Sequence, residues 1–145
     1  MTPVPEDAGA WRERRSQAAA AHAAAAERAR AADVAAAREV LDDFRSELVR
    51  LGVPPHPLRA VAGAARYRTG LTGWYLRRNG SLGLTTSGDY LVLTVAPSLA
   101  ARIRGVRPEP AEPSLQVGRG ARDGESIGLV ELLALRLAEL TGRDG

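Results

Sequence analysis

The chain of 145 residues has no cysteine, and all 20 of its basic residues are arginine, so it has no lysine either. The lack of cysteine excludes disulfides, thiolate metal ligands and thiol nucleophiles. The lack of lysine excludes a Schiff-base amine and the lysine of a phosphate-binding P-loop. Histidine occurs only at His22 and His56. A zinc or iron site would therefore need carboxylates for most of its ligands, which is uncommon. We expect no metal and no cofactor.

Long apolar runs are also missing. No segment approaches the roughly 18 consecutive apolar residues that suggest a membrane-spanning helix. Near the N-terminus, Glu6 and Asp7 stand where a signal peptide would have its basic region, and no leucine-rich segment follows. The sequence therefore predicts a cytoplasmic protein with no membrane partner.

Large apolar side chains are scarce at the N-terminal end, where the first 33 residues hold only Met1, Val4 and Trp11. This part of the chain cannot build a core, whereas the remainder has enough apolar residues for one small core. We expect a disordered N-terminus over residues 1–9, a long helix over residues 10–52, and a small α+β domain over residues 58–141 that packs against the second half of the helix.

The long helix is predicted because residues 10–51 contain no proline and are rich in alanine and other helix formers. Its second half carries apolar residues at heptad spacing, which favours packing along one seam. Gly52 and the prolines that follow end the helix. Its first half offers little to bury, which leaves two alternatives. It projects into solvent, or its alanine face packs closely against another helix.

An antiparallel meander is predicted around Asn79-Gly80, because this pair between two apolar runs is typical of a two-residue type I′ turn. That turn places Trp74 opposite Thr85 and Leu76 opposite Gly83, with Leu84 on the other face. Gly83, which has no side chain, would leave room for Trp74 or Leu76 to lie across the strand. Ser87-Gly88 then leads into a third strand over residues 90–95. Before the meander, residues 58–61 are expected to form a short turn, and after it residues 115–117 can add one edge strand. The predicted fold class is α+β, with a long N-terminal alanine-rich helix, an antiparallel sheet of three to four strands and a C-terminal amphipathic helix.

Two further helices are predicted after the meander. The first runs from Ser98 to Arg104, between Pro97 and Gly105, with Leu99 and Ile103 as its buried edge. The second runs over residues 127–140, with Val130 in its main apolar stripe and Arg136 and Glu139 on the opposite, solvent face. Leu132 and Leu135 fall on or near that polar face. We expect these leucines to be covered either by the heptad seam or by a second copy of the chain. The candidate interaction seam comprises Val34, Leu41, Phe44, Leu48, Leu132 and Leu135.

Positive charge is concentrated in residues 59–122, which hold ten arginines against Asp89, Glu109 and Glu112, a net charge of +7. A basic sheet with exposed aromatic rings is how many proteins hold single-stranded nucleic acid. A glycine-rich loop before the last helix adds two arginines that favour an anion there. The alternative for Trp74 is a place in the core. The candidate anion-binding or nucleic-acid-binding residues are Arg66, Arg68, Trp74, Arg77, Arg78, Arg119 and Arg122.

No arrangement of residues indicates catalysis, because neither histidine has a nucleophile or a carboxylate at a suggestive spacing. Our preferred hypothesis is a small non-enzymatic interaction module that associates with itself or binds a partner protein. The alternative is a binder of an anionic ligand or of single-stranded nucleic acid through the basic sheet.

Overall fold

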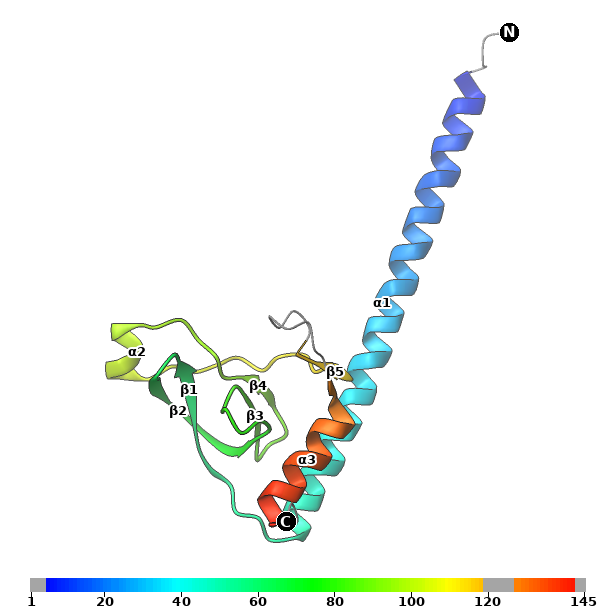
Figure 1. Cartoon of the computed structure of the whole chain (residues 1–145). Helices are drawn as coiled ribbons and strands as arrows, with labels where there is room; N and C mark the ends of the chain where they lie inside the picture. The colour runs from blue at the N-terminus through cyan, green and yellow to red at the C-terminus, as the bar shows by residue number, and fades with distance from the viewer. Residues whose placement is uncertain (1–4, 119–126, 143–145) are drawn as a thin grey trace.

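The computed structural model describes residues 5–118 and 127–142. One long helix, α1 (Pro5–Arg50), leads into a four-stranded antiparallel sheet, and a C-terminal helix returns to pack beside α1 (Figure 1). The α+β arrangement predicted from the sequence is thus confirmed. The remaining elements are β1 (His56–Ala62), β2 (Ala65–Tyr75), β3 (Leu82–Thr85), β4 (Tyr90–Val92), α2 (Leu99–Arg104), β5 (Gln116–Val117), β6 (Ile127–Gly128) and α3 (Leu129–Thr141).

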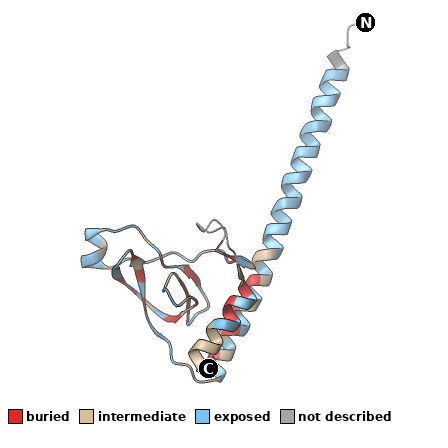
Figure 2. Ribbon diagram, in the orientation of Figure 1, coloured by how far each residue is buried: buried red, intermediate tan, exposed pale blue. Residues whose placement is uncertain are grey.

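Helix α1 begins at Pro5, earlier than the predicted start at residue 10. Residues 5–9, predicted to be disordered, are therefore helical, whereas residues 1–4 lie outside the described residues. Proline suits the first helical position, because that position needs no backbone N–H. The side chains of residues 7–32 are all exposed, and we call this segment the arm (Figure 2). The arm projects away from the rest of the chain. Of the two alternatives predicted for the first half of the helix, the structure has projection into solvent.

The sheet closes on itself. β1 and β2 form a hairpin, β3 and β4 follow in order, and the chain after β4 pairs back with β1. There the Val61 N–H donates to the Leu93 carbonyl at 2.7 Å, and the Val95 N–H donates to the Val61 carbonyl at 2.9 Å. Residues 58–61, which we expected to form a short turn, lie within β1. Closure gives the sheet a buried interior, occupied by Leu58, Leu71, Tyr75, Leu91 and Leu93.

The hairpin between β2 and β3 has a different register from the predicted one. A type I′ turn needs positive φ at both central residues, but only glycines have positive φ among the described residues, and Gly80 has φ 77°. A turn instead closes between the Gly80 N–H and the Arg77 carbonyl at 3.0 Å. The loop is one residue longer, so Trp74 pairs with Leu84 rather than with Thr85.

A shift of one residue exchanges the two faces of a strand. Leu84 therefore lies on the same face as Trp74, not on the opposite face as predicted. Gly83 turns to the interior of the sheet, where an added Cβ would lie 2.9 Å from Leu93 Cδ1 and 3.3 Å from Leu58 Cδ1. Gly83 thus makes room for two interior leucines, and not for Trp74 or Leu76 as its predicted orientation implied.

Helix α3 covers the outer face of the sheet together with the second half of α1. Leu132 is only 9% exposed and belongs to the same buried cluster as Leu41, Phe44 and Leu48 of α1, while Val34 is half-buried. Most of the predicted seam is therefore core within one chain. Leu135 is 59% exposed and takes no part in it.

The buried face of α3 is rotated from the predicted stripe. Arg136, expected on the solvent face, donates from Nε to the Tyr75 carbonyl at 2.8 Å, and Glu139 contacts Arg78 at 2.5 Å. Val130, expected within the apolar stripe, is 60% exposed. This rotation occurs because the hairpin offers carbonyl and guanidinium partners to the polar side chains of α3.

Helix α2 lies at the end of the closed sheet that is farthest from α1 (Figure 1). Ser98 caps it, with Oγ accepting a hydrogen bond from the Ala101 N–H at 3.2 Å, and Gly105 follows its last residue. The predicted buried edge is wrong, since Leu99 and Ile103 are 73% and 68% exposed. Ala101 faces the sheet instead, because its small side chain lets the helix approach closely.

A candidate anion-binding site

The arginines predicted as a binding site do not lie together. Arg66 and Arg68 are exposed on β2, whereas Arg77 and Arg78 lie in the β2–β3 loop, beside α3. Arg77 is half-buried and Arg78 contacts Glu139. The other two predicted residues, Arg119 and Arg122, lie outside the described residues.

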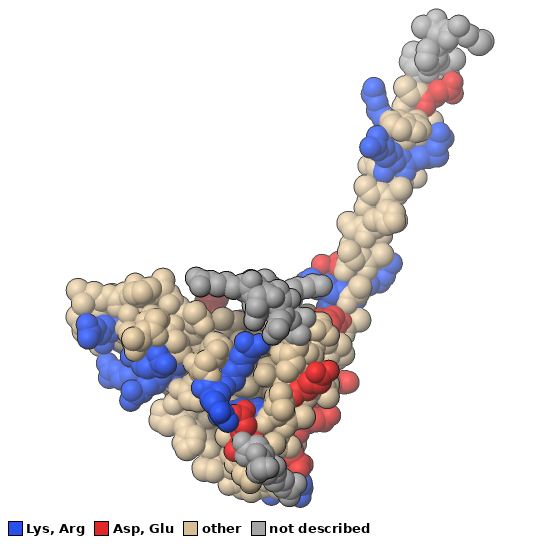
Figure 3. Space-filling model, in the orientation of Figure 1, with Lys and Arg blue, Asp and Glu red and all other residues tan. Residues whose placement is uncertain are grey.

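Charge is unevenly distributed over the surface. One group of basic side chains lies at the end of the molecule that carries β1, β2 and α2, acidic side chains line the lower part of α1, and further basic side chains lie on the arm and beside α3 (Figure 3). The sequence has the same asymmetry, with eight arginines between residues 56 and 107 and Asp89 as the single acid. Asp89 lies immediately before β4, away from α2. A surface of one charge sign attracts ligands of the other sign.

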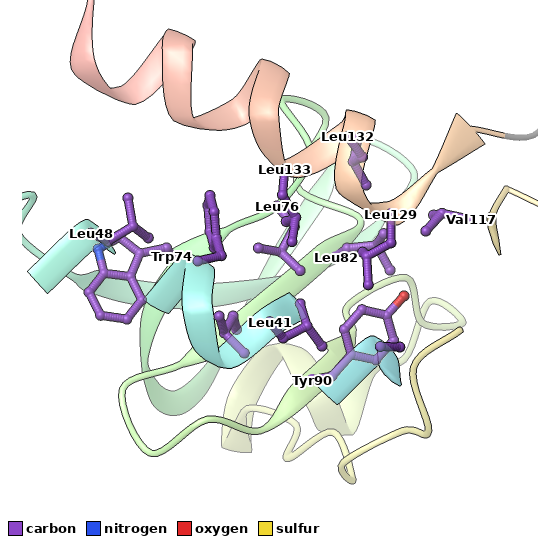
Figure 4. Close-up of a cluster of buried hydrophobic side chains, with 13 residues drawn as sticks. Leu41, Leu48, Trp74, Leu76, Leu82, Tyr90, Val117, Leu129, Leu132 and Leu133 are labelled. Carbon is purple, nitrogen blue, oxygen red and sulfur yellow. The ribbon is translucent and has the colours of Figure 1, made fainter. Parts of the chain in front are cut away.

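Trp74 is part of the core and not of a binding surface. It is 3% exposed, it packs among the leucines of α1, β3 and α3, and its Nε1 donates to the Val53 carbonyl at 3.2 Å (Figure 4). Tyr67 and Tyr90 are also buried, at 5% and 8% exposure. The described sheet therefore offers none of these rings as a platform for stacked bases, and of the two alternatives for Trp74 the structure has the core one.

A different set of arginines converges on a pocket. Arg68 of β2, Arg104 at the end of α2 and Arg107 just beyond it line an open cavity of about 430 Å³. We call this cavity the arginine pocket. No acidic residue contributes to its lining, which consists of Arg68, Thr69, Gly70, Arg104, Gly105, Val106 and Arg107. In the sequence, Arg104 and Arg107 appear only as general positive charge, because nothing local shows that they fold back onto β2.

Gly105 makes this convergence possible. It has φ 82° and ψ 178°, a region that is essentially restricted to glycine, and an added Cβ would lie 2.7 Å from the Arg68 carbonyl oxygen. The close approach lets the Val106 N–H donate to that same oxygen at 2.8 Å. Arg68 Nη2 in turn donates to the Ile103 carbonyl at 2.9 Å. These contacts hold Arg68, which lines the pocket, in place against the end of α2.

A second cavity of about 360 Å³ adjoins the arginine pocket and shares Arg68, Thr69 and Gly70 with it. It adds Arg59, which the register of the β1–β2 hairpin places directly opposite Arg68. The hairpin is irregular here, and Gly70 has φ 71°. Thr69 fixes the irregularity by donating from Oγ1 to the Leu58 carbonyl at 2.6 Å. Arg68 therefore stands between two adjacent cavities.

The chemistry of this surface suits an anion. The planar guanidinium groups of arginine bind phosphate and carboxylate with paired hydrogen bonds. Within residues 5–118 and 127–142 there is no cluster of three or more His, Asp or Glu residues that could hold a metal ion. In the same part of the chain, no helix has both the length and the apolar character needed to span a membrane.

Comparisons of this chain with protein-family models, with curated proteins and with solved structures find no match.

Proposed function

We propose that this protein is a binding module that takes a ligand with two or more phosphate groups at the arginine pocket and the cavity beside it. The observation that carries this proposal is the convergence of Arg68, Arg104 and Arg107 on one cavity with no acidic residue in its lining. Arg59 and the shared Arg68 extend the same chemistry into the second cavity. Two adjacent anion sites favour a ligand with consecutive phosphates over a single inorganic ion.

Single-stranded nucleic acid is one ligand of this kind, and the basic composition of the segment already suggested it. With Trp74, Tyr67 and Tyr90 buried, such a strand would be held through its phosphates and not through stacked bases. We therefore expect binding with little dependence on base sequence. We also expect competition from pyrophosphate, which carries the same groups without bases.

The test is a fluorescence-anisotropy titration with a mixed-sequence single-stranded oligonucleotide. Arg59, Arg68, Arg104 and Arg107 would make four contacts with phosphates. Four such contacts correspond to a slope of about −3 in log K against log salt, so affinity should fall roughly 50-fold between about 50 and 200 mM salt. The double change Arg104→Ser with Arg107→Ser should reduce that slope by about 1.4 and weaken binding for every oligonucleotide sequence alike.

Arg38→Ser is the matched control, because Arg38 is an exposed arginine on α1 and the change removes the same type of charge away from the pocket. It should leave most of the affinity intact. If only net charge mattered, the double change at Arg104 and Arg107 would lower log K about twice as much as Arg38→Ser; a ratio of about two or less would therefore contradict a defined site. No binding of either oligonucleotide or pyrophosphate at low salt would also reject the proposal.

Association with another protein chain, our preferred hypothesis from the sequence, is the second candidate function. It is favoured by the arm, in which residues 7–32 form a continuous helix with every side chain exposed. Burial of an apolar face normally provides most of the stability of a helix in a protein. An uncovered helix of this length is therefore a surface available to a partner.

A further inference from the structure

A groove runs between α1 and α3 on the acidic side of the molecule. Its volume is about 320 Å³, and its lining is mainly apolar. Val130 on its α3 side is 60% exposed although it is a large aliphatic residue. The lining residues are Val40, Asp43, Phe44, Glu47, Val130, Leu133, Ala134 and Leu137.

One edge of this groove is acidic. Glu39, Asp43 and Glu47 are spaced four residues apart on α1 and so lie on the same side of the helix. Glu39 and Asp43 are exposed, and neither makes an ion pair with a residue that the structure describes. An apolar groove with an acidic edge fits an amphipathic helix that carries an aromatic or aliphatic anchor and positive charge.

The end of the arm has these properties. Trp11 is 54% exposed, and the Arg15 guanidinium lies 5.1 Å from the centre of its ring. Arg12 and Arg14 are neighbours of Trp11 in sequence and are exposed as well. None of the three arginines forms an ion pair with any side chain in the described part of the chain. We call Trp11, Arg12, Arg14 and Arg15 the arm tip.

The arm tip cannot reach the groove of its own chain. Trp11 and Phe44 are 33 positions apart on one continuous helix, a separation of about 50 Å at 1.5 Å per residue. Residues 10–50 contain neither proline nor glycine, so the helix has no residue that would favour a sharp bend. A groove and an arm that match each other but cannot meet within one chain can meet between two copies.

We propose that two copies of this chain pair their α1 helices in antiparallel orientation, with the arm tip of each copy in the groove of the other. If Trp11 of one copy lies beside Phe44 of the other, the symmetry axis passes near Glu27 and Arg28. The alanines on both sides of this point let the two helices approach closely. The arrangement is a closed twofold dimer with two identical contacts between tip and groove.

The first experiment measures mass by light scattering and sedimentation over a range of concentrations. The wild-type chain should change from 15.3 kDa to twice that mass as the concentration rises. Arg12→Glu with Arg15→Glu should weaken dimerisation at least tenfold, as should Glu39→Arg with Asp43→Arg, because each places like charges together. All four positions are exposed, and circular dichroism checks that each variant is folded.

Combining all four changes in one chain restores opposite charges and should recover the wild-type dissociation constant to within about threefold. Glu109→Arg, a reversal at an exposed acid outside the groove, is the control and should leave dimerisation unchanged. A wild-type monomer at every concentration would overturn the proposal. So would a dimer that both double reversals leave intact.

The second experiment tests the orientation and uses the absence of native cysteine. The double variant Ala8→Cys with Ala134→Cys should form a disulfide-linked dimer under mild oxidation, because residue 134 lines the groove and residue 8 lies on the same side of α1 as Trp11. The single variant Ala21→Cys should not, since antiparallel pairing places residue 21 of one copy beside residue 34 of the other. Cross-linking through residue 21 without cross-linking between residues 8 and 134 would indicate parallel pairing and refute the proposal.

Discussion

Replacing Trp74 with alanine tests whether this residue is structural or takes part in binding. The side chain is 3% exposed in the cluster between the sheet, α1 and α3. An aromatic side chain buries about 150–250 Å², which at about 25 cal/mol per Å² corresponds to about 4–6 kcal/mol. Measured losses for such truncations are about 3–5 kcal/mol, and this is the decrease in unfolding free energy that we expect.

The assay is thermal and urea unfolding followed by circular dichroism. For a chain of this size, a loss of about 3–5 kcal/mol lowers the melting temperature by roughly 10–20 °C. Trp74→Phe is the matched variant. It keeps most of the apolar area but removes the Nε1 donor to the Val53 carbonyl. We expect a loss of about 1–3 kcal/mol from it, because that carbonyl loses its partner and part of the ring is gone.

A melting temperature for Trp74→Ala within about 2 °C of the wild-type value would refute the reasoning, because a buried tryptophan cannot be removed at so small a cost. Unchanged stability together with lost oligonucleotide binding would contradict the structural role of Trp74 even more strongly. It would show that Trp74 is a stacking platform and that the sheet face which carries it opens to solvent.

Three further predictions concern glycines at close interatomic contacts and the ionisation of Tyr90. Gly73→Ala should destabilise the fold far more than Gly83→Ala. A Cβ added at Gly73 would lie 2.0 Å from the Leu84 backbone oxygen, whereas a Cβ added at Gly83 would contact only movable leucine side chains. For Gly83→Ala we expect the free energy of unfolding, measured with urea, to fall by about 1–3 kcal/mol. Gly105→Ala should cost about 1–3 kcal/mol and also weaken phosphate binding, because it strains the backbone that joins α2 to Arg68; binding equal to wild type would contradict that role. Burial raises the pKa of Tyr90, which the Arg77 guanidinium only partly opposes. The folded state therefore holds this proton more tightly, so stability is complete below about pH 10 and falls as the pH rises further, and Tyr90→Phe should flatten that fall in melts at alkaline pH.

Local signals in the sequence were sufficient for the types of the elements. The long helix followed from the absence of proline over residues 10–51, helix α2 from Pro97 before it and Gly105 after it, and strand β5 from the short apolar stretch at residues 115–117. Each of these features depends on neighbours within a few residues. They could therefore be predicted without knowledge of the packing.

The register of the β2–β3 hairpin and the buried faces of β3 and α3 could not be predicted from local signals. The pair Asn79-Gly80 fits both a two-residue turn and the longer loop that occurs, and the choice between them exchanges the faces of β3. The closed sheet, with its buried interior, requires leucines on both faces of its strands. Leu132 shows the same limit, because a helical wheel gives the spacing of apolar residues but not the direction from which the sheet approaches α3.

For the candidate site, the sequence accounts for the positive charge and the tertiary structure accounts for the arrangement of the arginines. The sequence by itself determined that residues 59–122 are strongly basic, since charge depends only on composition. Only the tertiary structure decided which arginines line one cavity. Arg68 and Arg104 are 36 positions apart, and they meet because Gly105 permits backbone contact between α2 and β2. Such a contact between distant segments leaves no periodic pattern in the sequence. The helical character of the arm, in contrast, follows from alanine propensity, because every side chain of residues 7–32 is exposed and the Arg30–Glu112 ion pair at its base is its one ion pair with a distant residue in the described part of the chain.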